Sequence, residues 1–284
     1  MFNLSGKIDQ QKVAALLAIK KEADILNITF FVVGAFARDI ILKHCYGINP
    51  RRMTGDIDLG INVNDWAQFN KSTDSLISTG KFSRTKEPQR LLFESIPIDI
   101  VPFGKIAGEK VKIDWPPEHE IFMSIAGFKE AFENSIIFRL NSDPELDIKV
   151  PTLPSLAIMK LISWKEKYPE RPKDADDLFF IMNEYEHAGN FDRLYTQEQD
   201  LLMEEGFDNQ IACIRLLGRD MAMIADKDTA NVVRSILDDK TNDPHKLIID
   251  ILRGQRMPDN NFETINLKFE NLKKGFVEVS AKGL

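Results

Sequence analysis

The segment Gly55-Asp56-Ile57-Asp58-Leu59 alternates acidic and apolar side chains, as a half-buried strand does. In an extended strand alternate side chains share a face, so Asp56 and Asp58 point one way while Ile57 and Leu59 point the other. Two carboxylates about 7 Å apart on one strand repel each other unless a positive charge lies between them. Mg²⁺ takes one or two protein carboxylates and completes its shell with water and phosphate oxygens. The segment therefore predicts a metal–phosphate site, although such an acidic pair also occurs on solvated strand edges.

A second candidate lies upstream, where the apolar run Phe30–Val33 ends at Gly34-Ala35 and a helical pattern begins. A short continuous apolar run predicts a buried strand. Small residues at the start of a helix let backbone N–H groups approach a phosphate, and the helix dipole adds to the attraction. Glycine before a helix is also an ordinary tight turn, so this motif gains weight only beside the acidic pair.

A third acid, Asp99, lies within the apolar sequence Ile98-Asp99-Ile100-Val101. A carboxylate in such a strand is expected to be paired, bound to a metal or turned to solvent. The order of a small-residue turn, an acidic pair and a third acid is far more specific than any one part. We therefore treat Asp99 as a candidate third metal ligand.

Composition describes a globular chain with material for a substantial core: 284 residues, 43% hydrophobic and 29% charged. A chain of this length is expected to form one large or two modest domains. No run of about 18 apolar residues predicts a membrane span, and the first residues lack the pattern of a signal peptide. Cys45 and Cys213 are far apart without metal-ligand spacing, which is typical of free thiols in a reducing cytoplasm. We expect a cytoplasmic protein.

The net charge of −7 argues against a sequence-independent nucleic-acid coat, which needs a positive surface. It leaves room for a local basic groove, and basic residues do flank the acidic strand on both sides. Ordinary surface charge of both signs is the alternative explanation. The four histidines have no ligand spacing, so no zinc site is expected. The basic candidates are Arg38, Lys43, Arg51, Arg52, Arg84, Lys86 and Arg90.

The chain up to about residue 150 is predicted to mix strands and helices. Helices are expected over 9–27, from 35 to about 46 and over 65–78. Strands are expected over 30–33, 56–63, 81–86, 90–95 and 98–103, with a turn at Ser95-Ile96-Pro97. The pattern between 104 and 150 is weaker, with strands expected over 110–114 and 136–140.

After Pro154 the pattern becomes helical throughout. Ser155 is expected to cap a helix that runs to about Lys167, and Lys173-Asp174 opens another that ends near Gly189. Further helices are expected over 196–206, 207–225, 228–239 and 243–253, and residues from 255 onward show no firm pattern. The boundary is placed within 115–152, which gives an α/β domain over 1–150 and a helical domain over 151–284.

The order of motifs resembles that of the nucleotidyltransferase superfamily, which has the polymerase-β-like fold. The matching pieces are Val33-Gly34-Ala35, Gly55-Asp56-Ile57-Asp58-Leu59 and Ile98-Asp99-Ile100. The resemblance implies an α+β fold in which a mixed sheet is flanked by helices and followed by an all-helical C-terminal domain. One departure stands out, because Ala35 replaces the usual glycine or serine and offers no hydroxyl to a phosphate.

A closer resemblance, over roughly residues 28–185, is to the AbiEii-type nucleotidyltransferases, the toxin half of type IV toxin–antitoxin pairs. The apolar helix around Lys160 and the following Lys173-Asp174-x-x-Asp177-Leu178 match the pattern of that group. From the residues alone, an alternative to a phosphate-binding role is that the ammonium of Lys160 extends past its apolar stem to solvent. Asp174 and Asp177 are likewise explained by ordinary charge placement at a helix N-terminus.

The resemblance implies a role for each motif residue. Asp56, Asp58 and Asp99 would hold Mg²⁺ or Mn²⁺, and Asp99 would help deprotonate an acceptor hydroxyl. Gly34 and Ala35 would bind the phosphates of a nucleoside triphosphate. Arg38 and Lys160 would also bind the phosphates. Lys160 and Asp174 complete the set of candidate catalytic residues.

The implied partners are a nucleoside triphosphate, an acceptor for which tRNA is one candidate, and a cognate antitoxin protein; no membrane is expected. Two alternatives remain open. A small-molecule enzyme of the aminoglycoside-nucleotidyltransferase type would suit the acidic net charge, because its acceptor is cationic. A catalytically inactive nucleotide-sensing module would suit the change at Ala35.

Overall fold

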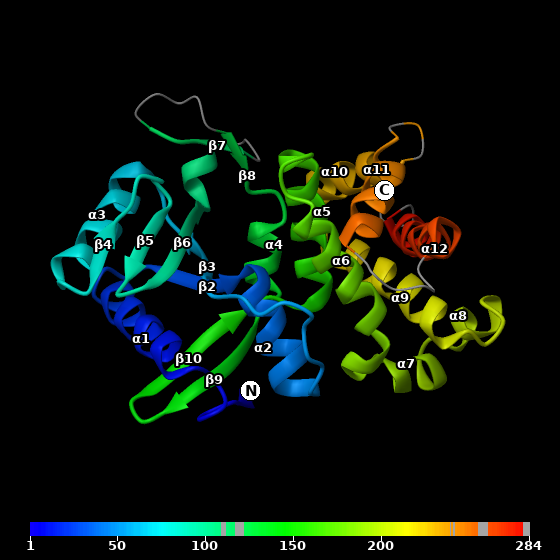
Figure 1. Ribbon diagram of the computed structural model, residues 1–284, viewed down its shortest axis with the longest axis horizontal. Coiled ribbons are helices and arrows are strands. Elements are labelled where there is room, and N and C mark those ends of the chain that lie inside the picture. The colour runs from blue at the N-terminus through cyan, green and yellow to red at the C-terminus, as the bar shows by residue number, and fades with distance from the viewer. Residues whose placement is uncertain (109–111, 117–121, 239, 241, 255–260, 281–284) are drawn as a thin grey trace. The chain divides into compact units, whose positions relative to one another are not determined.

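The structure is a computed structural model that describes residues 1–284 except 109–111, 117–121, 239, 241, 255–260 and 281–284. The chain forms two compact units, Met1–Thr152 and Leu153–Leu284 (Figure 1). The first unit mixes strands and helices, and the secondary structure described in the second is helical. The predicted α+β class with a helical C-terminal part is therefore confirmed.

A five-stranded mixed sheet forms the centre of the first unit (Figure 1). Its two middle strands, β3 and β6, are parallel, and the other neighbours are antiparallel. The helix α2 (Gly34–Tyr46) leads from β2 toward β3. The strands, in spatial order, are β2 (Thr29–Val33), β3 (Ile57–Asn62), β6 (Ile96–Phe103), β5 (Arg90–Phe93) and β4 (Phe82–Arg84).

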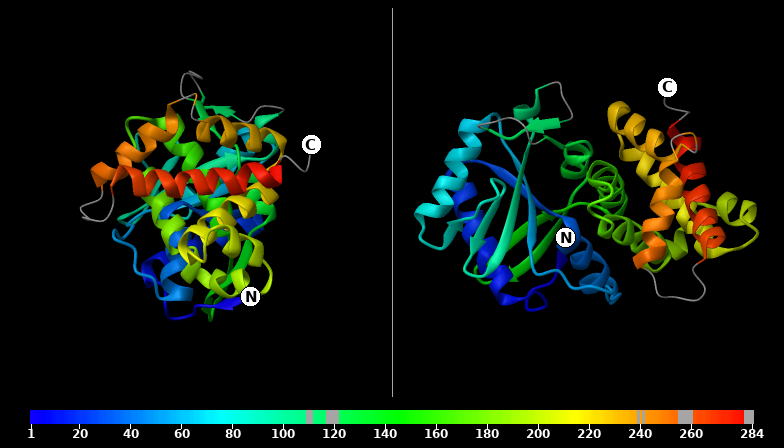
Figure 2. Two further views of the ribbon diagram at one scale, coloured as in Figure 1. Left: turned by 90° about the vertical axis from the view of Figure 1, so that its right-hand side faces the viewer. Right: turned by 45° about the horizontal axis from the view of Figure 1, so that its top comes forward.

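One face of this sheet is apolar and is covered by α1 (Gln10–Ile25) and α3 (Trp66–Ser78), which lie side by side (Figure 2). Asp9 and Asp65 cap the two helices through hydrogen bonds to first-turn amides. Side chains at alternate strand positions, such as Leu59 and Ile100, are almost fully buried on this side. Their burial supplies the hydrophobic driving force that holds the sheet in place.

The opposite face carries an aromatic cluster. The ring of Phe31 lies over Gly60, where an added Cβ would come within 2.1 Å of the ring. Phe31 also contacts Phe103 on β6 and the rings of Phe128 and Phe132 from α4 (Phe128–Glu133). Aromatic side chains therefore cover this part of the second face of the sheet. Asp58, two residues before Gly60 on β3, lies on the same face beside them.

Two smaller sheets complete the first unit. The pairing of β9 with β10 is antiparallel, and that of β1 with β9 is parallel. The strand at 145–150 was not predicted, and the predicted strand over 110–114 lies partly outside the described residues. The elements are β1 (Phe2–Asn3), β9 (Ile136–Ser142) and β10 (Glu145–Val150) in one sheet, β7 (Lys112–Asp114) and β8 (Phe122–Ser124) in the other, with a short 3₁₀ helix at Lys105–Ala107.

The turn between β5 and β6 lies at a different position from the one predicted. Its connection is Glu94-Ser95, with Phe93 opposite Ile96, whereas the turn was placed at Ser95-Ile96-Pro97. Glu94 adopts a positive φ of 53°, as two-residue hairpin turns require, without the glycine or asparagine that usually signals one. The register of this hairpin places Arg90 opposite Asp99.

The described residues of the second unit form helices, as predicted, with several differences in detail, among them the helix α7, which was not predicted. Ser155 lies in the first turn of its helix rather than capping it, the next helix ends at Glu184, and a long helix follows residue 260. The elements are α5 (Leu153–Lys167), α6 (Lys173–Glu184), a π-helical turn at Glu186–Asn190, α7 (Phe191–Thr196), α8 (Gln199–Glu204), α9 (Asn209–Ile224), α10 (Lys227–Leu237), α11 (Asp243–Gly254) and α12 (Phe262–Ser280).

The crossing of α9 and α12 is unusually close because a glycine faces the partner backbone on each side. A Cβ added at Gly218 would lie 2.1 Å from the carbonyl oxygen of Leu272, and one added at Gly275 would lie 1.9 Å from that of Arg215. A backbone atom cannot rotate away as a side chain can. Either substitution must therefore separate the helices.

No helix in the described part of the chain has the length and apolar character to cross a membrane.

We expect Gly218→Ala to destabilise the second unit by about 1–3 kcal/mol, the usual cost of overpacking. Alanine has the higher helix propensity, by about 1 kcal/mol, so crowding and propensity act in opposite directions. The measurement is urea unfolding of the full chain followed by circular dichroism. Gly55→Ala is the control, because no atom lies within 4 Å of its added Cβ. A gain in stability for Gly218→Ala would contradict the close crossing.

Candidate active site

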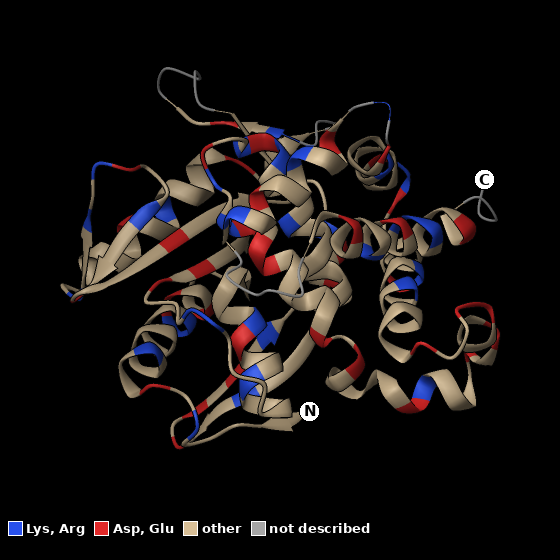
Figure 3. Ribbon diagram, turned by 45° about the vertical axis from the view of Figure 1, so that its right-hand side comes forward, with Lys and Arg blue, Asp and Glu red and all other residues tan. Residues whose placement is uncertain are grey.

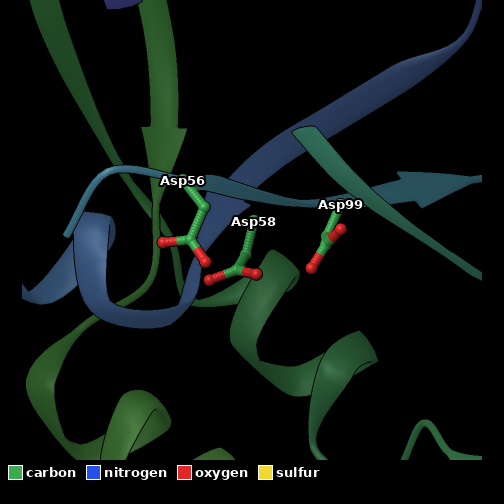
Figure 4. A group of neighbouring side chains, drawn as sticks. All are labelled: Asp56, Asp58 and Asp99. Carbon is green, nitrogen blue, oxygen red and sulfur yellow. The ribbon is translucent and has the colours of Figure 1, made fainter. Parts of the chain in front are cut away.

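Three carboxylates of the first unit, Asp56, Asp58 and Asp99, converge on one side of the sheet (Figure 4). One oxygen from each lies within 4.8 Å of one oxygen from each of the others, and all three residues are half-buried. The strand register explains the convergence, because Asp58 on β3 is directly opposite Asp99 on the parallel strand β6. Asp56 precedes β3 by one residue and is held by a hydrogen bond from the Thr54 hydroxyl.

Gly34 makes room for this cluster. It has a φ of +67°, and a Cβ added there would lie 2.0 Å from Oδ2 of Asp58. Val33, the partner of Asp58 across the β2–β3 pair, is the N-cap of α2, and its side chain cannot cap the first amides of the helix. The N-terminus of α2 thus combines backbone donors, a helix dipole and a close approach to the acidic cluster. Ala35, the next residue, is buried.

The donor set fits a hard divalent cation. Carboxylate oxygens are the ligands that Mg²⁺ and Mn²⁺ prefer, and the three offered here are close enough together for small side-chain shifts to complete a site. The absence of a Cβ at Gly34 leaves Asp58 its place beside the helix N-terminus. The residues present therefore suit a metal–phosphate site.

Arg38 is buried on α2 rather than exposed at the surface. Its guanidinium donates to the carboxylate of Asp39 at 2.6 and 2.9 Å. A further contact reaches the carbonyl of Arg52 at 3.5 Å. These contacts attach α2 to the segment that leads into β3, so Arg38 supports the position of the acidic strand.

Two basic residues beside the cluster were not identified from the sequence as site residues. Arg90 on β5 donates to both oxygens of Asp99, at 2.6 and 2.7 Å. From the sequence Arg90 is a candidate only for a basic groove, because no pairing register between its strand and that of Asp99 was predicted.

Lys12 is the second such residue. Its ammonium donates to the carbonyl of Thr54 at 2.8 Å and lies 4.3 Å from the centre of the Phe36 ring. Burial lowers the pKa of Lys12, although the attraction of Asp39 and Asp56 opposes the shift. The sequence pattern placed Lys12 on the solvent side of its helix, and no local signal indicated the contact with Thr54, which is 42 residues away.

The remaining predicted residues, Lys160, Asp174 and Asp177, form a buried ionic cluster within the second unit. The ammonium of Lys160 on α5 lies 2.8 Å from Asp174 and 2.7 Å from Asp177, both on α6. Ser163 donates to the other oxygen of Asp174 at 2.9 Å, and Arg171 lies 3.6 Å from it. Lys160 therefore points to two carboxylates rather than past its apolar stem to solvent.

The charges in this cluster hold one another ionised. Burial alone would lower the pKa of Lys160, but attraction to Asp174 and Asp177 outweighs it and raises that pKa. Burial would likewise raise the pKa of Asp174, but attraction to Lys160 and Arg171 outweighs it and lowers that pKa. The stability that Asp174 contributes is thus complete above its unfolded pKa of about 3.8 and is lost as the pH falls through its lower folded pKa.

We expect Lys160→Met to destabilise the chain by about 3–5 kcal/mol at pH 7, the usual cost of leaving a buried charge without its partner. Without the ammonium, burial raises the pKa of Asp174, so the carboxyl becomes neutral at mildly acidic pH. The difference in unfolding free energy from wild type should therefore shrink between pH 7 and pH 4. Urea unfolding at several pH values measures it, with Lys173→Met, an exposed neighbour on α6, as the control. A difference independent of pH would contradict this account.

Three solved structures illustrate what the fold is similar to. The solution structure of the antibiotic-resistance factor ANT(2'')-Ia is 13% identical, with 70% of this chain and 98% of that chain covered and a TM-score of 0.37. An antigenic nucleotidyltransferase-like protein from Paracoccidioides brasiliensis is 16% identical, with 71% and 93% covered and a TM-score of 0.40. A CCA-adding enzyme in complex with ATP is 14% identical, with 97% and 83% covered and a TM-score of 0.35. No curated protein sequence matches the chain.

The family comparison covers most of the chain. Residues 16–268 match the family described as the nucleotidyl transferase AbiEii toxin of type IV toxin–antitoxin systems. The match spans the acidic cluster, the turn at Gly34 and the cluster around Lys160, which are the motifs on which the resemblance was based. The chain therefore belongs to the AbiEii family and is a nucleotidyltransferase.

Proposed function

We propose that this chain is a divalent-metal-dependent nucleotidyltransferase that moves a nucleoside monophosphate from a nucleoside triphosphate to an acceptor hydroxyl. The observation that carries the proposal is the convergence of Asp56, Asp58 and Asp99 beside the N-terminus of α2. Such a cluster offers cation ligands and phosphate-binding amides in one place.

The residues of the first unit divide the work. A bound Mg²⁺ or Mn²⁺ would supply charge that neutralises the phosphates and activates the acceptor oxygen. Asp56 and Asp58 would hold it, with Asp56 kept in place by Thr54. Asp99 would share that role and accept the proton of the acceptor hydroxyl. The amides of Gly34 and Ala35 would bind the triphosphate, aided by the dipole of α2.

The cluster around Lys160, within the second unit, is a further part of the proposal. Asp174 and Asp177 fix the ammonium of Lys160 in one position, and Lys160 would bind a phosphate oxygen of the triphosphate by exchanging one of these carboxylate contacts for it. Asp174 would help position the acceptor.

For the acceptor we propose tRNA, and for the biological role the toxin half of a type IV pair whose activity a cognate antitoxin protein counters. The family match supports the toxin role. Basic and acidic residues are interspersed on both units (Figure 3), so the net charge of −7 leaves basic positions available for an RNA backbone. A small-molecule acceptor and a module that only senses nucleotide are the competing functions.

We expect Asp58→Asn to reduce pyrophosphate release by more than about 100-fold, because loss of even an outer-shell partner of a metal ligand commonly costs 10–100-fold. The assay supplies Mg²⁺ and each of the four nucleoside triphosphates, with and without total tRNA. Asp74→Asn, a change at an exposed carboxylate in the same unit that pairs with Arg84, should retain wild-type activity.

The assay also separates the competing functions. Release that requires both Asp58 and tRNA supports an RNA nucleotidyltransferase. Release with a cationic small molecule but without RNA supports the aminoglycoside-type enzyme. Nucleotide binding without release by wild type, across RNA and small-molecule acceptors, contradicts a catalytic role and supports the sensing module. Slowed growth on expression of wild type, but not of Asp58→Asn, tests the toxin role.

We expect Gly34→Ala to weaken binding of Mn²⁺ by about 10–100-fold, because the added Cβ would occupy the place of the Asp58 carboxylate and the φ of +67° is strained for alanine. Isothermal titration calorimetry with Mn²⁺ measures the change. Gly55→Ala adds the same methyl group beside Asp56, where no atom lies within 4 Å, and should bind Mn²⁺ as wild type does. Equal binding by both variants would contradict the close approach of Gly34 to Asp58.

A further inference from the structure

We propose that Arg90 competes with a divalent cation for Asp99 and so makes the acidic site selective for a cation delivered with a triphosphate over the free cation. This inference rests on the proposed function, since it assigns Asp99 to a metal site. It adds a role for a residue outside the motifs that identify the family.

The sheet register creates the competition. Across three neighbouring strands Asp58 lies directly opposite Asp99, and Asp99 lies directly opposite Arg90. Asp99 therefore has a carboxylate on one side and a guanidinium on the other. The two hydrogen bonds from Arg90, at 2.6 and 2.7 Å, engage both oxygens of Asp99. A cation that binds Asp99 has to share or displace these contacts.

Charge decides when the exchange is favourable. The guanidinium cancels one of three negative charges in the cluster, so the site that a free cation meets is less attractive than three carboxylates would be. A triphosphate brings negative charge of its own. It compensates a cation at Asp99 and offers the displaced guanidinium new acceptors, to which arginine binds in the same forked manner.

Stabilisation of the fold is a weak explanation for this ion pair. The side chain of Arg90 is 33% exposed and that of Asp99 is 18% exposed, and ion pairs near the surface add little to stability. The chain also contains a second pair of the same construction. Arg139 on β9 donates to both oxygens of its cross-strand partner Asp147, at 2.8 Å each, in the smaller sheet. Arg139 also contacts Glu145 at 3.0 Å, so this pair is a control for a forked cross-strand Arg–Asp contact that lies outside the acidic cluster.

The experiment titrates Mn²⁺ into wild type, Arg90→Gln and Arg139→Gln and measures free Mn²⁺ by electron paramagnetic resonance. Each titration is run without nucleotide and with a non-hydrolysable α,β-methylene triphosphate. Without nucleotide, Arg90→Gln should bind Mn²⁺ about tenfold more tightly than wild type, because one opposing charge is gone. With the analogue, Arg90→Gln should lose this advantage. Arg139→Gln should match wild type in both conditions.

A role for Arg90 in packing or in orienting Asp99 predicts otherwise. If Arg90→Gln binds Mn²⁺ equally or more weakly without nucleotide, while Asp58→Asn abolishes the binding seen in wild type, competition is overturned and the proposed metal site stands. If wild type binds no Mn²⁺ in either condition, the proposed metal site fails and the competition fails with it. Arg90→Lys keeps the charge without the fork and should fall between wild type and Arg90→Gln, which gives a second test if the glutamine variant does not fold.

Discussion

The mutual repulsion of three carboxylates on adjacent strands is the constraint around which the first unit is organised. The parallel pairing of β3 with β6 fixes Asp58 opposite Asp99, and neither can move away without breaking the sheet. Arg90 on one side of the carboxylates and the N-terminal amides of α2 on the other reduce this repulsion. Gly34 allows the end of α2 to come this close, since only a residue without a Cβ leaves room for the Asp58 carboxylate.

The sheet can carry this charged cluster because its two faces are used differently. The face toward α1 and α3 is filled with aliphatic side chains, and the aromatic cluster around Phe31 closes part of the other. Only the positions beside the aromatic cluster remain for polar groups. The apolar face thus provides the stability that the acidic cluster takes away, a division often seen where function strains a fold.

The sequence was informative where the signal was local. The strand–turn–helix at Gly34, the acidic alternation at Asp56 and the apolar context of Asp99 are all short patterns, and they led to the α+β class and to the family. The two basic partners were missed for different reasons, because Arg90 depends on the exact position of the β5–β6 turn and Lys12 contacts Thr54 from 42 residues away. A turn at Glu94-Ser95, rather than at Ser95-Ile96-Pro97, brings Arg90 opposite Asp99. The helix α12 was missed although its buried residues Ile265, Phe269, Leu272 and Phe276 recur at helical spacing.

Charge balance connects the two basic neighbours to the reaction. With Lys12 and Arg90 beside it, the cluster is only weakly negative, so two free dications would leave it strongly positive. A triphosphate that arrives with the cations brings the total back toward neutrality. In a half-buried site an uncompensated charge is costly, and cations and phosphate should therefore bind together more readily than either alone. In the proposed metal site, an order of binding imposed by charge would keep Asp56, Asp58 and Asp99 from holding metal when no nucleotide is present.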